Sequence, residues 1–181
     1  MRRLTITLIA LAGILSFIPA ARCQTFGSTG TTNISVTVAA EASLYVSTAT
    51  TALTSGGTLF SDYTGTTNLL YKIRTSKGAG TGNIQAQVTT DFSPTGGPLV
   101  ATPPTTGDTL SYSCTVSTPG TACDPGQIAS TTSGTPVVSF SADARSARAG
   151  NSGSVSWTLT NDPQYKTGPY SATVTFTVSA T

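Results

Sequence analysis

The chain has 181 residues, among them 37 Thr, 22 Ser, 18 Gly and 10 Pro, and only 9% of its residues are charged, against a usual share of about a quarter. It contains a single Glu and no His, which disfavours helices and coiled coils and removes the commonest general base and metal ligand. Thr and Val favour strands, whereas Gly and Pro favour turns. The composition therefore predicts an all-β protein without His-dependent chemistry.

The first 23 residues show the basic, apolar, small-residue order typical of a secretory signal peptide. Their apolar run, residues 4–18, is shorter than the roughly 20 residues that a membrane-spanning helix needs. We expect cleavage after Cys23, so that the mature chain begins at Gln24. The alternative is a lipoprotein acylated on Cys23, against which Arg22 argues because a small residue normally precedes such a cysteine.

Removal of the signal peptide changes the charge of the chain. Six Lys and Arg then face seven Asp and Glu, so the net charge falls from +2 to −1. The mature chain has no basic excess to neutralise phosphates, and nucleic-acid binding is not expected. The sequence predicts a secreted protein, at the cell surface or in the periplasm, with no membrane span in its mature part.

Two cysteines remain after cleavage, Cys114 and Cys123. An even pair in an oxidising compartment predicts a disulfide, and Pro119-Gly120 between them favours a turn that brings the ends together. A redox pair or a metal site is the alternative. A separation of nine residues does not fit Cys-x-x-Cys, and two thiolates without His make a poor zinc site.

Segments with alternating apolar and polar residues run through the mature chain. Clean alternation is typical of antiparallel sheets with one solvated face. The sequence thus predicts one antiparallel β-sandwich, immunoglobulin-like, of about eight strands over residues 33–181, after a flexible leader at 24–32. The apolar positions that define the strands are Ile34, Val36, Val38, Leu44, Val46, Leu69, Tyr71, Ile73, Ile84, Ala86, Val88, Leu110, Tyr112, Cys114, Val116, Val138, Phe140, Val155, Trp157, Leu159, Tyr170, Ala172, Val174, Phe176 and Val178.

Three stretches between these strands have distinct compositions. Residues 93–108 carry several Pro and Gly and predict a long surface loop. The glycine-rich residues 78–82 lack the Lys-Ser or Lys-Thr of a phosphate loop and favour a hairpin turn. Residues 143–153 are the only helix-permissive stretch, long enough for about one turn.

The predicted core centres on four aromatic residues on the apolar sides of strands, with three aliphatic neighbours. The expected members are Tyr71, Tyr112, Trp157, Phe176, Val155, Leu159 and Val174. For Trp157 the alternative is a sugar-stacking side chain, but Val155 and Leu159 on the same strand face favour the core.

No catalytic motif stands out. Glu41 and six Asp could in principle pair for glycoside cleavage, but most of the Asp sit beside turn residues, where Asp usually bonds its own backbone. A Ser nucleophile would lack a His base. Arg145 and Arg148 could contact an acidic partner or a glycan, but a solvated loop is the favoured interpretation. We expect no enzyme activity and no cofactor.

Two segments carry a resemblance to a known family. Residues 32–40 read TNISVTVAA, and residues 166–178 read KTGPYSATVTFTV. The pair resembles bacterial secreted β-sandwich subunits of the alpha-fimbria (colonization-factor-type) pilin and spore-coat-U type, over about 25 residues at the two ends. Trp157-Thr158-Leu159 is also similar to the WxL cell-wall-binding domains, but a second Trp-x-Leu is missing.

The pilin resemblance implies donor-strand complementation, in which a neighbour's N-terminal strand completes the sandwich. Ile34, Val36 and Val38 are then the candidate donor strand; alternatively they form the first strand of a complete domain. The expected function is a secreted structural or adhesive subunit, fimbria-like or coat-like. Its implied partners are itself, other surface subunits and a periplasmic chaperone. The alternative, from a different functional class, is a soluble extracellular module that binds carbohydrate or the cell wall.

Overall fold

The computed structural model describes residues 29–57 and 59–181, so the predicted signal peptide and the start of the leader lie outside the described residues. The chain divides into two units, residues 1–36 and 37–181. In the first unit, residues 29–36 form no strand, and in the second, residues 37–40 precede the first strand.

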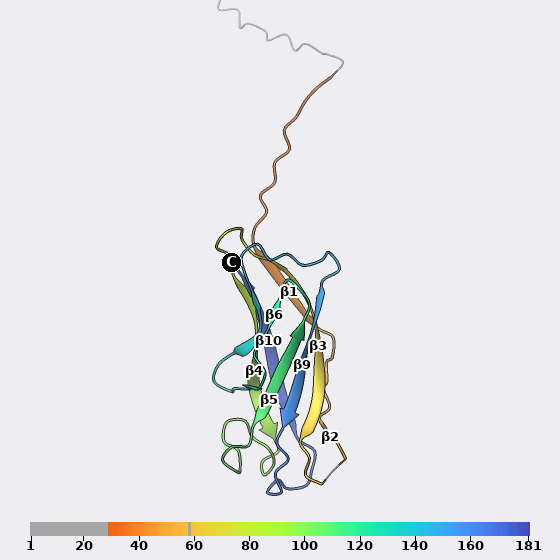
Figure 1. The fold of residues 1–181 in the computed structure, drawn as a ribbon, viewed down its shortest axis with the longest axis vertical. Helices are drawn as coiled ribbons and strands as arrows, with labels where there is room; N and C mark the ends of the chain where they lie inside the picture. Colours follow the sequence, from red (N-terminus) through yellow and green to blue (C-terminus); the bar gives the residue numbers. More distant parts are fainter. Residues whose placement is uncertain (1–28, 58) are drawn as a thin grey trace, which may run out of the picture. The chain divides into compact units, whose positions relative to one another are not determined.

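Two antiparallel sheets build residues 37–181, as the composition predicted, and the described part contains no helix (Figure 1). One sheet has the order β1-β3-β9-β5-β7, with β2 paired to β3, and the other has the order β10-β4-β8-β6. Three two-residue strands raise the number above the eight expected. The strands are β1 (Glu41–Val46), β2 (Thr54–Ser55), β3 (Tyr63–Arg74), β4 (Gly82–Ser93), β5 (Leu110–Val116), β6 (Thr121–Ala122), β7 (Gln127–Ile128), β8 (Thr135–Phe140), β9 (Asn151–Leu159) and β10 (Ser171–Ala180).

The core lies between the sheets and follows the period-two alternation of the sequence. β9 shows this most clearly, because Val155, Trp157 and Leu159 are buried while Ser156 is exposed. Tyr71 packs against Phe140 with ring centroids 5.2 Å apart, and Tyr112 packs against Trp157 at 5.0 Å. The aromatic centre of the core is therefore as predicted for Tyr71, Tyr112 and Trp157.

Two expectations about connections are wrong. Residues 78–82 do not close a hairpin, because β3 and β4 belong to different sheets and the chain crosses between them here. Gly80 makes the crossing possible, since a Cβ on it would lie 2.3 Å from the amide nitrogen of Ser76. Residues 143–150 form turns rather than a helix, with Asp143 at φ 59°. The long connection predicted at 93–108 is present between β4 and β5.

Candidate binding groove

One side of the sandwich is incompletely closed. The first sheet ends there in β1 and the second in β10, and the two strands lie close together without forming a ladder. β1 pairs only with β3, and β10 pairs only with β4. Within the described residues, each of these edges therefore presents backbone groups that no neighbouring strand satisfies.

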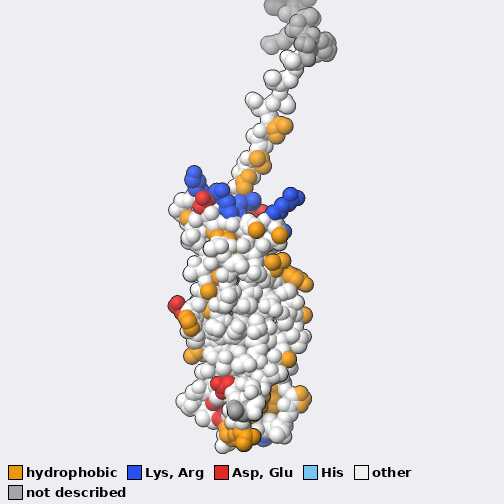
Figure 2. All heavy atoms as spheres, turned by 45° about the vertical axis from the view of Figure 1, so that its right-hand side comes forward, with side chains coloured by type: hydrophobic (Ala, Val, Ile, Leu, Met, Phe, Trp, Pro, Cys, Tyr) orange, Lys and Arg blue, Asp and Glu red, His pale blue; other side chains and the backbone are white. Residues whose placement is uncertain are grey.

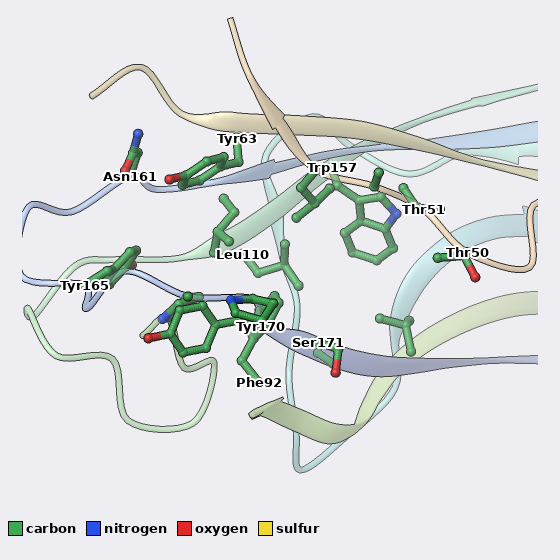
Figure 3. A pocket seen from close by; sticks show the side chains of 18 of the residues that line it. Thr50, Thr51, Tyr63, Phe92, Leu110, Trp157, Asn161, Tyr165, Tyr170 and Ser171 are labelled. Atoms are coloured by element: carbon green, nitrogen blue, oxygen red, sulfur yellow. The ribbon is translucent and has the colours of Figure 1, made fainter. Parts of the chain in front are cut away.

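A groove of about 1160 Å³ opens along this side (Figure 3). It lies toward the start of β10, where the chain has left β1 and continues as residues 47–53. One wall is formed by residues 48–53 and the other by residues 171–176. Leu110, Trp157 and Leu159, all of them buried, form its floor.

The first wall is held to the floor by a chain of hydrogen bonds. The Trp157 Nε1–H donates to Thr67 Oγ1 at 2.9 Å, and that hydroxyl is 2.6 Å from Thr51 Oγ1. Gly65 on β3 lets the wall approach closely, because a Cβ there would lie 2.5 Å from the Ala52 carbonyl oxygen. Residues 48–53 therefore run alongside β3 but do not form a strand of the sheet.

The second wall is the inward face of β10, and it is only half-buried. Ala172, Val174 and Phe176 point toward the core, yet none of them is buried. Phe176 touches the floor through Trp157, with ring centroids 6.5 Å apart. Phe176 and Val174 thus face the core and pack against it as predicted, but they are only half-buried and line the groove.

Aromatic side chains lie at the end of the groove that is next to the loops preceding β10, here called the wide end. Tyr63, Tyr165 and Tyr170 are labelled there in Figure 3 and contribute to the lining. Tyr170 packs on Gly97, where a Cβ would lie 2.3 Å from the ring. The Tyr165 hydroxyl donates to Asp108 Oδ2 at 2.9 Å, and burial together with this carboxylate raises the pKa of Tyr165.

The candidate donor residues lie in no strand of the described chain. Ile34 is 93% exposed, Val36 is 84% exposed and Val38 is 62% exposed. The first strand begins only at Glu41. In this structure these residues therefore do not form the first strand of the sandwich.

The predicted disulfide is present. Cys114 on β5 is bonded to Cys123, which directly follows β6, with 5.5 Å between the Cα atoms. β5 and β6 belong to different sheets, so the bond ties the two layers together. Neither cysteine lines the groove.

The remaining polar candidates have structural roles. Asp91 accepts backbone N–H bonds from Phe92, Val100 and Ala101 through its two oxygens. Trp157 is 5% exposed, so the sugar-stacking interpretation of this side chain is wrong. Among the described residues, no three His, Cys, Asp or Glu side chains gather in an arrangement suited to a metal ion.

No protein-family model, curated protein or solved structure matches this chain. Over the residues that the structure describes, no helix is long and apolar enough to cross a membrane. The groove and the residues before β1 are therefore the features of the molecule that bear on its function.

Proposed function

We propose that this protein is a secreted structural subunit, fimbria-like or coat-like, that assembles by β-strand donation. The segment that ends at Val38 in one copy fills the groove between residues 47–53 and β10 of another copy. The supporting observation is the coexistence of two complementary features in one chain. One is an apolar groove bordered by unpaired edges, and the other is an exposed apolar segment outside any strand.

The spacing of the apolar residues is the same on both sides. Ile34, Val36 and Val38 recur every second residue, as do Ala172, Val174 and Phe176 on β10. In extended conformation each set spans about 13 Å. A donated strand would thus place its three apolar side chains over the floor while its polar residues, such as Ser35 and Thr37, face solvent.

The shape of the groove favours one direction of donation. At the narrow end β1 lies close to β10, whereas the wide end leads out between loops. The donor must leave the groove at Val38 to reach its own β1, and the wide end offers the exit. The donor then runs antiparallel to β10, which is also the more favourable pairing.

Burial supplies a driving force of suitable size. Complete burial of one Ile and two Val contributes about 5–8 kcal/mol, and new ladder hydrogen bonds satisfy the free edge of β10. Association and the ordering of the donor segment oppose these terms. Secretion agrees with the proposal, because the N-terminal sequence and the disulfide both fit an oxidising compartment.

The test is a pair of variants at adjacent positions of the mature chain. Val36→Asp would place a carboxylate in the apolar groove and is expected to abolish polymers on a sizing column. Ser35→Asp adds the same charge on the solvent face of the donated strand and is expected to assemble. Equal behaviour of the two variants would contradict strand donation, because only a paired strand distinguishes neighbouring residues by face.

A carbohydrate-binding module is the second candidate, favoured by the tyrosines at the wide end of the groove and by Phe60, which is 62% exposed. Aromatic faces of this kind stack against sugar rings. This function predicts retention of the monomer on a polysaccharide column and loss of retention in Phe60→Ala. Strand donation predicts no dependence of assembly on Phe60.

A further inference from the structure

All the charged side chains of residues 37–181 except Asp124 fall into two groups, one at each end of the sandwich. Five of the six Lys and Arg lie where β3 ends and where residues 141–150 turn, together with two carboxylates. This group, here called the basic end, has a net charge of +3. Figure 2 shows these cations gathered at one end. The basic end comprises Lys72, Arg74, Lys77, Arg145 and Arg148, with Glu41 and Asp143.

The opposite end of the sandwich carries the complementary charge. Three Asp lie in the loops around the wide end of the groove, and a fourth, Asp91, lies near the end of β4; together with one cation they give a net charge of −3. Asp162 lines the groove itself. Asp62 accepts the Asn161 amide at 3.3 Å, so the two loops lie together. The acidic end comprises Asp62, Asp91, Asp108 and Asp162, with Lys166.

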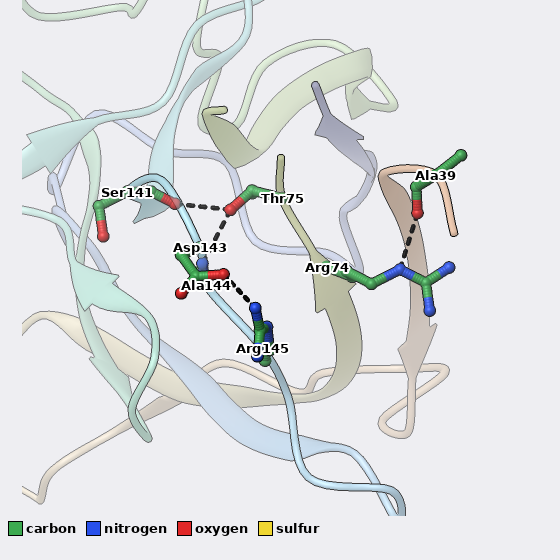
Figure 4. Close-up of polar contacts among 7 residues, drawn as sticks. All are labelled: Ala39, Arg74, Thr75, Ser141, Asp143, Ala144 and Arg145. Carbon is green, nitrogen blue, oxygen red and sulfur yellow. Dashed lines mark hydrogen bonds and ion pairs between the residues drawn. The ribbon is translucent and has the colours of Figure 1, made fainter. Parts of the chain in front are cut away.

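Hydrogen bonds fix the basic end to the sheet (Figure 4). Arg74 donates to Glu41 at 3.0 Å and, through Nε, to the Ala39 carbonyl at 2.7 Å. The buried Thr75 donates to the Ser141 carbonyl at 2.7 Å and accepts the Ala144 amide at 2.8 Å. Arg145 pairs with Asp143. These bonds hold the side chains of the basic end in place, and through Arg74 the basic end contacts Ala39, the residue next to the proposed donor strand.

We propose that, in the assembly, the basic end of each subunit docks on the acidic end of the next subunit. The inference rests on the proposed strand donation, which brings the two ends together. A donor that fills the groove antiparallel to β10 places Val38 near Ala172, at the acidic end. Only Ala39 and Ala40 then separate the donor strand from the donor's Glu41, a reach of about 10 Å at most.

The electrostatic consequence follows from this short reach. At physiological ionic strength the screening length is about 8 Å, so the net +3 and −3 ends interact across the junction. Such complementarity accelerates association and rejects the wrong orientation. The basic end would repel a second basic end, which leaves head-to-tail growth as the favoured arrangement.

Charge-reversal variants of the mature chain test the proposal. Lys77→Glu/Arg148→Glu makes the basic end negative, and neither side chain forms a recorded ion pair. Asp62→Lys/Gln164→Lys removes the net negative charge of the acidic end by changes at two exposed positions. Each double variant alone is expected to polymerise at least about tenfold more slowly than the unaltered chain at low salt.

An equimolar mixture of the two double variants is the decisive sample. In the mixture, the unaltered basic end of one variant can dock on the unaltered acidic end of the other, and no junction between unlike variants joins like charges. The mixture is therefore expected to polymerise faster than either variant alone. A misfolded variant could not be rescued in this way. Ser113→Glu/Thr115→Glu, on the exposed face of β5, controls for added negative charge and is expected to leave the rate unchanged.

The outcomes separate this inference from strand donation. Strand donation is supported if Val36→Asp loses its polymers. If, in addition, both charge variants assemble normally, or the mixture of the two is not rescued, end-to-end docking is overturned and strand donation is unaffected. Absence of polymers from the unaltered chain overturns both. A rate that is independent of salt between about 20 and 300 mM would also contradict the docking.

Discussion

β9 and β10 show the same alternation of apolar and polar residues, but their apolar side chains are buried to different extents. Both alternate apolar residues with Ser or Thr. On β9, Val155, Trp157 and Leu159 are all buried, whereas on β10 the inward residues from Ala172 to Ala180 are all only half-buried. The difference arises because β9 lies between β3 and β5, while β10 has β4 on one side and no strand on the other. Alternation thus defines a face, and the number of neighbouring strands decides how well that face is covered.

The largest expected effect comes from truncating the equivalent aromatic residue on each strand. Trp157→Ala removes a buried ring that also donates to Thr67, and we expect a loss of about 3–5 kcal/mol in unfolding free energy. Phe176→Ala removes a half-exposed ring and should cost about 1–2 kcal/mol in the unassembled subunit. Urea unfolding of each variant in the Val36→Asp background, which cannot donate, measures both. Equal losses would mean that the β10 side is as closed as the β9 side.

Removal of the disulfide tests the side of the molecule away from the groove. Cys114→Ser/Cys123→Ser frees a loop of about ten residues, and the chain-entropy description predicts a loss of about 2.5–3 kcal/mol. Because neither cysteine lines the groove, the variant should still polymerise at temperatures where it is folded. Loss of assembly by a fully folded variant would place the disulfide within the assembly mechanism. Thiol titration of the denatured, unaltered mature chain should find no free thiol.

Alkaline pH should lower the free energy of unfolding through two buried tyrosines of the core. Burial raises the pKa of both Tyr71 and Tyr112 above the usual 10.0. A raised pKa in the folded state means that folding favours the neutral phenol. The contribution is complete below pH 10 and is lost as the pH rises through the folded-state values. The unfolding midpoint in urea should therefore fall between pH 9 and pH 12, and less steeply in Tyr71→Phe/Tyr112→Phe. An unchanged slope in that variant would contradict the assignment.

The smallest effect on stability is expected at the basic end. Glu41→Gln breaks the ion pair with Arg74, in which both side chains are largely exposed. Exposed pairs contribute about 0.2–1 kcal/mol, so the urea midpoint should hardly change. A loss above about 2 kcal/mol would show that the charges at this end serve the subunit's own stability rather than contact with a partner.

The sequence predicted the sheets better than their arrangement. Period two placed Tyr71, Tyr112, Trp157 and Val155 in the core correctly, because burial of one strand face is a local property of the chain. The incomplete burial of Phe176 and Val174 was not predicted, because local alternation contains no information about how many strands flank β10. The same limit applies to residues 78–82, where a glycine-rich connection between two strands was predicted as a hairpin but joins the two sheets.

The groove itself could not be predicted from the pattern. Its walls come from residues 48–53 and 171–176, and its wide end from loops around Tyr165 and Tyr170, which meet only in the folded chain. The segregation of charge was likewise invisible, because Lys72 and Arg148 are distant in sequence. A clue was available in the three apolar residues from Ile34 to Val38, whose alternation the sequence shows but whose partner it does not.

Hydrogen exchange on β10 tests the central claim most directly. The acceptor is the mature Val36→Asp chain, and the donor is a peptide of residues 29–40 with the unaltered sequence. We predict that the peptide slows exchange at alternate amides of residues 171–177, those that point away from β4, and that the Val36→Asp peptide does not. Unchanged exchange along β10 at saturating peptide, or protection only at the opposite edges β6 and β7, would contradict strand donation into the groove.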